Sequence, residues 1–241
     1  MIERAYIEVN GIRVEVVRKE IRNLHLAVYP PNGRVRVAVP MRINDEAVRL
    51  AIITRLGWIR RQQAGYARQE RQSRREMVTG ESHYVRGRRY RLDVIEIEGR
   101  PSVRIANNRM LELRVRPASS REERFDLLQR WYRRQLRAEI PGLIAKWEPI
   151  LGVTVTDWSV RTMKLRWGSC KVESGRIWIN VELAKKSPQC LEYIVLHEMV
   201  HLLERLHTDQ FRAHMDRFLP QWETIRAELN RAPLKHEDWE Y

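Results

Sequence analysis

Alternating apolar and polar residues predict two β-hairpins at the start of the chain. Ala5–Val9 and Ile12–Val17 flank Asn10-Gly11, a dipeptide typical of the type I′ turn that joins two strands. Leu24–Tyr29 and Val35–Val39 flank a Pro-Pro-Asn-Gly turn, and apolar residues recur at every second position of both. Each of these strands should therefore bury one face.

A long basic helix, over about residues 45–76, is expected after the hairpins. Asn44 is a favourable N-cap, two acidic residues stand in the first turn, and apolar residues recur at helical spacing as far as Ile59. The later part, from Arg60 to Arg75, is polar and strongly basic. It either projects into solvent or lies on an anionic surface.

A second β-rich stretch follows and ends at Pro117. Turn-forming residues separate its short segments, and no internal repeat is evident in the sequence. Residues 1–117 are therefore interpreted as a basic, β-rich N-terminal region. Its further expected strands are Tyr84-Val85, Tyr90–Ile97, Ser102–Ile105 and Met110–Val115.

Residues 118–241 are interpreted as a second domain of mixed helices and strands. A capping box, Ser120-x-x-Glu123, opens a long helix that runs towards Trp147. Strands are expected at Val153–Trp158 and Gly175–Val181, and the second could be an exposed edge that pairs with an extended substrate. The prediction is an α+β fold in which helices pack on a small sheet.

Two more helices are expected in this domain. Ser187-Pro188 is a favourable helix start, because proline suits the first turn. Thr208 can cap a final helix that extends to Leu229 and that Pro220 would bend or interrupt.

The helix that begins at Ser187-Pro188 contains the most informative motif of the chain, His197-Glu198-Met199-Val200-His201. Two histidines four residues apart lie on one helix face, close enough to bind one zinc ion. The glutamate between them is placed to act as a general base on a water molecule that the metal activates. Apolar residues surround the motif, so the helix should be buried and its histidines should need partners.

A third zinc ligand is expected from the residues that follow the motif. His207 stands six residues after His201, and three protein ligands would leave one zinc position open, as in catalytic sites. Glu223, Asp216 and His214 are alternative third ligands. We favour His207, because a nitrogen ligand at this compact spacing needs no long-range coincidence.

Arg166-Trp167-Gly168-Ser169-Cys170 is a second candidate for the site. Gly168 could let the backbone approach the metal cleft, and Arg166 could bind a substrate carboxylate or stabilise a developing oxyanion. The alternative is a structural turn in which Arg166 pairs with an acid. Cys170 lacks a defined histidine partner, which argues against a cysteine protease.

Positive charge is concentrated in the N-terminal part of the chain. The net charge is +14; residues 1–140 contain 31 Lys and Arg against 17 Asp and Glu, whereas residues 141–241 contain 14 of each. Such asymmetry can mark an anionic partner, nucleic acid above all. The alternative is a solvated basic surface.

Composition favours a cytoplasmic protein without a membrane anchor. The chain of 241 residues has 2 cysteines and no Cys-x-x-Cys pair, and neither a signal peptide nor a transmembrane span is recognisable. Nitrogen rather than sulfur should therefore ligate the metal.

Several of these features together resemble the YgjP-like metallopeptidase family, whose zinc motif is similar to that of the SprT-like and WLM zincins. The resemblance is densest over residues 160–222 and extends more loosely over most of the chain. It is carried by the Arg-Trp-Gly-Ser-Cys sequence, the strand that ends at Asn180, the histidine motif, and His207-Thr208-x-x-Phe211.

This resemblance implies a zincin-like peptidase domain that binds Zn2+. It implies Glu198 as the catalytic carboxylate and His197, His201 and His207 as the zinc ligands. The chain departs from the family pattern at Leu206, Arg212 and Val181, none of which is an expected ligand.

Two functions are compatible with the sequence. The first is a zinc-dependent peptidase that hydrolyses polypeptides with Glu198 as general base. The second is a nucleic-acid-associated protein that has a structural or inactive metal site and binds through its basic N-terminal half. Similarity to SprT-like enzymes also suggests a combination, a protease that acts on DNA-bound proteins.

Overall fold

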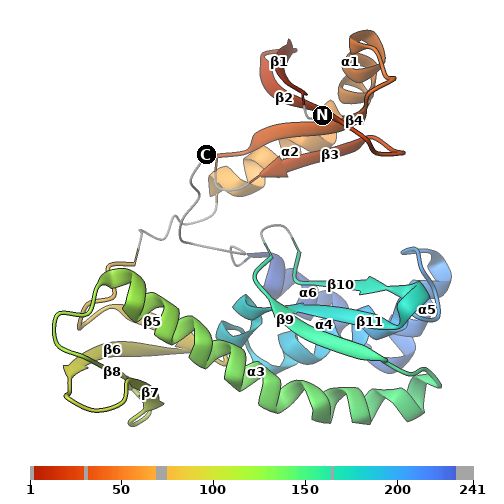
Figure 1. Ribbon diagram of the computed structural model, residues 1–241. Helices are drawn as coiled ribbons and strands as arrows, with labels where there is room; N and C mark the ends of the chain where they lie inside the picture. The colour runs from red at the N-terminus through yellow and green to blue at the C-terminus, as the bar shows by residue number, and fades with distance from the viewer. Residues whose placement is uncertain (1–2, 30–31, 69–74, 164–165, 232–241) are drawn as a thin grey trace. The chain divides into compact units, whose positions relative to one another are not determined.

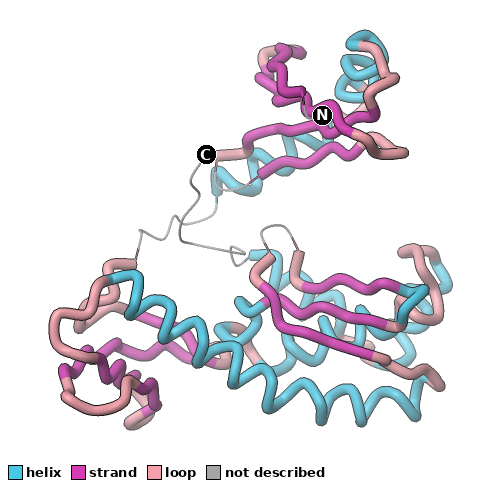
Figure 2. The backbone as a smooth tube through the Cα atoms, viewed as in Figure 1, coloured by secondary structure: helices cyan, strands magenta, loops and turns pink. Residues whose placement is uncertain are grey.

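The computed structural model describes residues 3–29, 32–68, 75–163 and 166–231. The chain divides into two compact units, unit 1 (Met1–Gln72) and unit 2 (Ser73–Tyr241) (Figure 1). Both units combine helices with small sheets (Figure 2), so the expected α+β fold class is confirmed. The domain boundary that the sequence suggested, after residue 117, lies inside unit 2.

A four-stranded sheet forms the centre of unit 1. The strands β1 (Glu3–Val9), β2 (Ile12–Lys19), β3 (His25–Tyr29) and β4 (Arg34–Pro40) are arranged in the order β1-β2-β4-β3. Both predicted hairpins are confirmed as antiparallel pairs. The hairpins meet through β2 and β4, which are parallel neighbours, a pairing that local patterns did not predict.

Two helices replace the single long helix expected over residues 45–76. Asn44 caps α1 (Asp45–Ile53) as predicted, because its side chain accepts a hydrogen bond from the Ala47 N–H at 2.9 Å. The chain then turns at Thr54, whose hydroxyl donates to the Ala51 carbonyl and so competes with helical backbone bonding. A second helix, α2, covers Leu56–Arg68, and residues 69–74 lie outside the described residues.

The helices of unit 1 cover one face of its sheet. Val48 and Ile52 of α1 and Ile59 of α2 are fully buried against alternate valines of the strands. These residues form a hydrophobic cluster of their own, separate from the cluster of unit 2.

Unit 2 begins with a second four-stranded sheet whose strand order matches that of the first. The strands β5 (Ser82–Val85), β6 (Arg88–Glu96), β7 (Ser102–Ile105) and β8 (Met110–Val115) are arranged in the order β5-β6-β8-β7. The outer pairs are antiparallel and the central pair is parallel, as in unit 1. The four expected strands are confirmed, and the structure shows a shared topology that the sequence did not.

The first hairpin of each sheet turns in the same way. Asn10 and Gly11 have φ angles of 51° and 76°, and Arg86 and Gly87 have φ angles of 50° and 78°. Two successive positive φ angles are the type I′ geometry that matches the twist of the strands.

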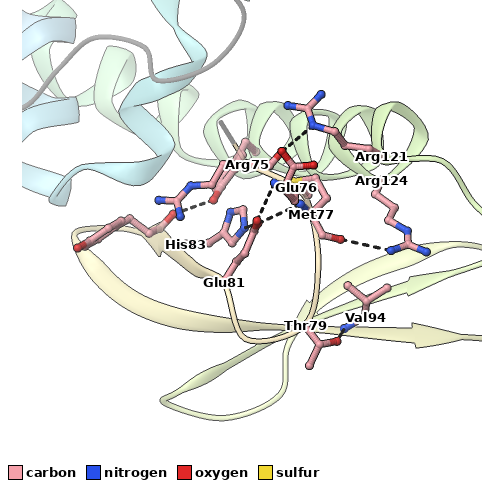
Figure 3. Close-up of polar contacts among 11 residues, drawn as sticks. Arg75, Glu76, Met77, Thr79, Glu81, His83, Val94, Arg121 and Arg124 are labelled. Atoms are coloured by element: carbon pink, nitrogen blue, oxygen red, sulfur yellow. Dashed lines mark hydrogen bonds and ion pairs between the residues drawn. The ribbon is translucent and has the colours of Figure 1, made fainter. Parts of the chain in front are cut away.

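The segment before β5 is attached to the start of the next helix (Figure 3). The Glu81 carboxylate accepts a hydrogen bond from the backbone N–H of Met77 at 3.1 Å. Arg121, the first residue of that helix, donates from Nε to the Arg75 carbonyl at 2.6 Å. These bonds connect the entry to the second sheet with α3 (Arg121–Leu151).

His83 of β5 is buried beside this segment. Its Nε2 atom lies 3.3 Å from a Glu81 carboxylate oxygen (Figure 3). Burial, together with the positive charges of Arg75 and Lys185, lowers the pKa of His83 to about 4, although Glu81 acts in the opposite direction. The side chain is therefore neutral at physiological pH.

The long helix α3 connects the two sheets of unit 2. Its predicted capping box is present, since Ser120 accepts from the Glu123 N–H and the Glu123 carboxylate accepts from the Ser120 N–H. The helix contacts β7 and β8 of one sheet and β9 (Asp157–Arg161) of the other. One hydrophobic cluster, from Met77 to Leu229, therefore includes both sheets and the C-terminal helices.

The third sheet contains β9 (Asp157–Arg161), β10 (Gly168–Lys171) and β11 (Arg176–Asn180) in the order β10-β11-β9. β9 begins later than the strand expected from Val153, and β10 was not expected as a strand. The suggestion that Gly175–Val181 forms an exposed edge is wrong. β11 lies in the centre, because β9 pairs with it in parallel and β10 pairs on its other side.

Three helices complete unit 2. α4 (Pro188–Val200) contains the histidine motif and contacts β10 and β11. The expected interruption near Pro220 is confirmed, because α5 (Asp209–Phe218) and α6 (Trp222–Arg231) are separate helices. None of the helices in the described ranges is long and apolar enough to cross a membrane.

Candidate active site

The helix α4 holds the first two histidines of the motif one turn apart. It begins at Pro188, which stands at the first helical position, and it is buried along most of its length. His201 is the C-cap residue, and its N–H donates to the His197 carbonyl at 3.3 Å. The helical spacing therefore places both imidazoles on the same face, as predicted.

The structure brings His207 to the same point. Nε2 of His207 lies 3.1 Å from Nε2 of His197, and one ring nitrogen from each of the three histidines lies within 4.8 Å of the others. Phe211 packs against all three rings, with ring centroids 4.7 to 4.9 Å away. It is 2% exposed, so it closes the apolar side of the cluster.

A tight turn after α4, which contains no glycine, leads the chain to His207. The N–H groups of Leu202 and Leu203 bond to carbonyls three residues earlier, which ends α4 in a tight turn. The Glu204 carbonyl lies 3.1 Å from Nδ1 of His201 and fixes the orientation of that ring. Thr208 then caps α5 by accepting from the Phe211 N–H, and His207 stands directly before this cap.

The three imidazoles are neutral at physiological pH. Burial, reinforced by the neighbouring imidazoles, lowers the pKa of His197 to about 3. Burial also lowers the pKa of His201 and of His207. The neutral imidazole is the form that binds a metal ion.

The donor set fits a metal ion of the zinc type. Two nitrogens bound to one tetrahedral zinc at ordinary bond lengths are about 3.3 Å apart, close to the separation of the His197 and His207 nitrogens. Within the described residues, Nδ1 of His197 is buried and has no hydrogen-bond partner, whereas Nδ1 of His201 contacts a carbonyl. The Nε2 atoms are therefore the ones that would hold a shared ion.

The carboxylate of Glu198 lies in a dry position beside the histidines. The residue is 5% exposed, and burial raises the pKa of its carboxyl group to about 8, although the positive charge of Arg166 acts to lower it. A carboxyl group with a pKa near the working pH can both accept and release a proton.

Gly168 makes room for that carboxylate. A Cβ atom on Gly168 would lie 2.5 Å from Oε1 and 2.7 Å from Cγ of Glu198, so only glycine fits this contact. The close approach expected of Gly168 is therefore present, and its partner is Glu198. Arg166 is exposed and lines the same cleft.

Asn180 supports the site structurally, although sequence reasoning assigned it no role. It is completely buried at the end of β11, and its Nδ2 donates to the carbonyls of Met163 at 2.8 Å and Arg166 at 2.7 Å. Its backbone N–H donates to the Trp167 carbonyl at 2.9 Å. These bonds hold the segment that carries Gly168 towards the site, and a buried asparagine after an apolar strand is the signal that could have identified it.

A cleft of about 870 Å³ opens in front of these residues. The strand β10 and the helices α4, α5 and α6 contribute to its walls, and Tyr193 stacks on Trp222 inside it at a centroid distance of 6.4 Å. Burial raises the pKa of Tyr193 to about 12, so its hydroxyl keeps its proton. In the part of the chain that the structure describes, the acidic residues of the cleft are Glu173 and Glu198, and the basic ones are Arg166, Lys171, Arg205, Arg212 and Arg226.

The alternative third ligands lie outside the histidine cluster. His214 stacks on Phe218, Asp216 accepts a hydrogen bond from Trp222 Nε1 at 2.7 Å, and Glu223 is exposed. Cys170 lines the cleft as a protonated thiol, because burial raises its pKa to about 11.

Known proteins place this arrangement in a family. Residues 22–232 match the family described as YgjP-like, metallopeptidase domain. No curated protein matches the chain. Two similar solved structures are the metallopeptidase zymogens abylysin from Pyrococcus abyssi and jannalysin from Methanocaldococcus jannaschii. Their sequence identities are 19% and 17%, their TM-scores are 0.35 and 0.34, and the similarity covers 37% of this chain and 90% and 92% of theirs.

The family match extends over most of the chain, including the histidine cluster, Glu198 and Gly168. It confirms the resemblance carried by the sequence motifs and the expected class of enzyme. The chain belongs to the YgjP-like family and is a metallopeptidase, a hydrolase of peptide bonds.

Proposed function

We propose that this metallopeptidase uses a zinc ion bound by His197, His201 and His207, with Glu198 as the general base. The observation that carries the proposal is the convergence of three neutral imidazoles within 4.8 Å, next to a buried carboxylate on the same helix. Three protein ligands leave the fourth zinc position open, which distinguishes catalytic from structural zinc sites.

The residues of the site would have separate roles in peptide hydrolysis: metal binding, proton transfer and positioning of the carboxylate. A zinc ion, when bound, would lower the pKa of a coordinated water molecule and polarise the scissile carbonyl. Glu198 would accept the proton of the attacking water and transfer it to the leaving amine. The contact with Gly168 holds the Glu198 carboxylate in place, so that little reorganisation accompanies the transfer.

The strand β10 is a candidate platform for an extended substrate. It is an end strand of its sheet, and residues 168–171 line the cleft beside Glu198. An extended polypeptide can add to such an edge through backbone hydrogen bonds. We infer that the substrate lies along β10, with its scissile bond over the histidine cluster.

The charge of the cleft favours acidic substrates. Among the described residues, five basic ones line it against two acidic ones, and one of the acidic ones, Glu198, is buried. Arg166 acts electrostatically on Glu198, and Arg226 on His197, so both charges reach the reaction centre. Opposite charge near a cleft raises the local concentration of substrate, and this effect weakens with salt.

Cleavage of a denatured protein by purified full-length enzyme tests the zinc mechanism. Activity should disappear on chelation and return with zinc. Glu198→Gln should abolish turnover but retain zinc, whereas Glu192→Gln, a change on the same helix away from the cluster, should retain both. His207→Ala should lower the zinc content, and His214→Ala should not. Full zinc binding by the His207 variant would exclude its ligand role.

A pair of fluorogenic peptides tests the substrate preference separately. One peptide carries Asp and Glu around the scissile bond, and the other carries Asn and Gln at the same positions. The acidic peptide should be cleaved faster at low salt, and Arg226→Glu should reverse the order. Equal cleavage of both peptides would refute the charge argument but not the zinc mechanism.

A further inference from the structure

The two four-stranded sheets share a topology but differ in their role in the fold. The β5–β6 turn of unit 2 bonds to the segment that leads into α4, because Arg86 and Gly87 donate their N–H groups to the carbonyls of Ala184 and Lys185. The second sheet also shares the hydrophobic cluster of the histidine helix. It is therefore part of the catalytic framework.

Among the described residues, the first sheet has a hydrophobic cluster separate from that of the histidine helix. Its hydrophobic cluster is completed by its own helices, α1 and α2. The Asn10-Gly11 turn, which corresponds to the Arg86-Gly87 turn, is exposed, and a Cβ on Gly11 would meet no atom within 4 Å. Unit 1 is therefore a compact module with a hydrophobic core of its own, and its sheet can have a role separate from that of the second sheet.

The face of this sheet opposite the helices carries arginines and tyrosines. Strand pairing sets Tyr6 opposite Glu15, Glu15 beside Arg36, and Arg34 opposite Tyr29, so these side chains point to one side. The valines that alternate with them point into the helix-covered core.

Charge on this face is predominantly positive. Glu15 is 5% exposed, and its carboxylate lies 4.0 Å from Arg34 and 3.7 Å from Arg36, so its negative charge is neutralised. Arg4 and Arg13 add exposed positive charge on the same side, against Glu8.

Aromatic rings lie among these charges. Tyr6 is 57% exposed, and the Arg13 guanidinium lies 4.3 Å from its ring centroid. Arg34 lies 5.5 Å from the ring centroid of Tyr29. Each pair presents planar groups on which a nucleic-acid base can stack, next to positive charge that can contact a phosphate.

We propose that the face of unit 1 formed by Arg4, Tyr6, Arg13, Tyr29, Arg34 and Arg36 binds single-stranded nucleic acid. Bases stack on the tyrosine rings and arginine planes, and the backbone phosphates lie near the guanidinium groups. Aromatic side chains on the face of a four-stranded sheet can stack on unpaired bases. The bases of a duplex are stacked on one another, so their faces are not accessible to such side chains. The combination of rings with positive charge favours this ligand over an acidic peptide, which lacks flat groups that stack.

Fluorescence anisotropy with the full-length chain and a labelled 20-nucleotide oligo(dT) tests the proposal. Binding should weaken steeply as salt increases. Tyr6→Ala should weaken binding by about tenfold, the effect of losing one stacked base. Replacing Arg13 and Arg36 together with alanine should weaken binding and flatten the salt dependence.

The matched control removes the same charge from the other side of the sheet. Arg60 and Arg61 of α2 are exposed. At moderate salt, which screens the loss of net charge, replacing both with alanine should change the affinity for oligo(dT) by no more than about twofold. Peptidase activity should match the parent chain in every variant, and thermal unfolding should show that each variant is folded at the assay temperature.

Four results would overturn the proposal. The first is no measurable binding, and the second is equal affinity for oligo(dT) and for a duplex of the same length. The third is equal weakening by the tyrosine variant and the α2 variant, which would indicate attraction by net charge alone. Competition by poly-glutamate as effective as unlabelled oligo(dT) would assign the face to acidic polypeptides.

Discussion

Replacement of Gly168 by alanine should separate metal binding from catalysis. The new Cβ would lie 2.5 Å from Oε1, 2.7 Å from Cγ and 2.9 Å from Cδ of Glu198. The optimal separation of nonbonded carbon atoms is about 3.5 to 4.0 Å. The Glu198 side chain must therefore move by about 1 Å, and it has little free space, since it is 5% exposed.

A displacement of this size has a calculable consequence for the rate. A misplacement of about 1 Å of a catalytic group can lower the rate about 100-fold. Overpacking a buried contact also destabilises the fold by about 1 to 3 kcal/mol. The histidine ligands proposed for zinc come from α4 and the turn after it, so the zinc content should remain that of the parent enzyme.

The assay compares peptide cleavage, zinc content and thermal unfolding for Gly168→Ala and Gly142→Ala. Gly142 lies in α3, where a Cβ would meet no atom within 4 Å, so its replacement should leave activity unchanged and preserve or slightly increase stability. Wild-type activity of Gly168→Ala would refute the role of this contact. Loss of zinc with activity would show that the change acts on the metal site instead.

Three further predictions concern the fold. Asn180→Ala should lower the free energy of unfolding by about 1 to 3 kcal/mol in chemical denaturation and reduce peptidase activity, because the Met163 and Arg166 carbonyls lose the donor that the buried Asn180 amide supplies; an unchanged unfolding midpoint would contradict it. The pKa of His83 is about 4 in the folded protein and 6.5 in the unfolded chain, so the neutral side chain contributes fully to the free energy of unfolding above pH 6.5. As the pH falls to 4, the free energy of unfolding should drop by up to about 3 kcal/mol relative to a His83→Gln variant. Parallel pH profiles of the two proteins would refute this. Gly87→Ala should lower the melting temperature more than Gly11→Ala. Both positions have a positive φ, but only a Cβ on residue 87 would lie within 3.3 Å of the Ser187 backbone. Equal effects of the two replacements would show that the Ser187 backbone moves away without measurable cost.

Several elements could be predicted because their causes are local. The Asn10-Gly11 turn, the Asn44 and Ser120 caps and the start of α4 depend on residues within a few positions of one another. The helical spacing of His197 and His201 likewise places their rings together without knowledge of the rest of the chain.

Other predictions failed where a local pattern was compatible with more than one structure. The stripe from Val48 to Ile59 suits a single helix, yet the chain turns at Thr54 so that both helices reach the sheet. The sequence suggested that the strand Arg176–Asn180 lies at the edge of its sheet. It is a central strand, because β9, which comes from an earlier part of the chain, pairs with it.

The sequence alone determined the chemistry available to this protein: the identity of the histidines, the carboxylate between two of them, and a metallopeptidase family. Tertiary structure decided where that chemistry meets. It brought Nε2 of His207 within 3.1 Å of Nε2 of His197 and set Gly168 against Glu198. It also placed Arg4, Arg13, Arg34 and Arg36 on one face of the first sheet. The reason is physical, because periodicity and capping record interactions between chain neighbours, whereas strand order and close packing arise only when distant segments exclude water together.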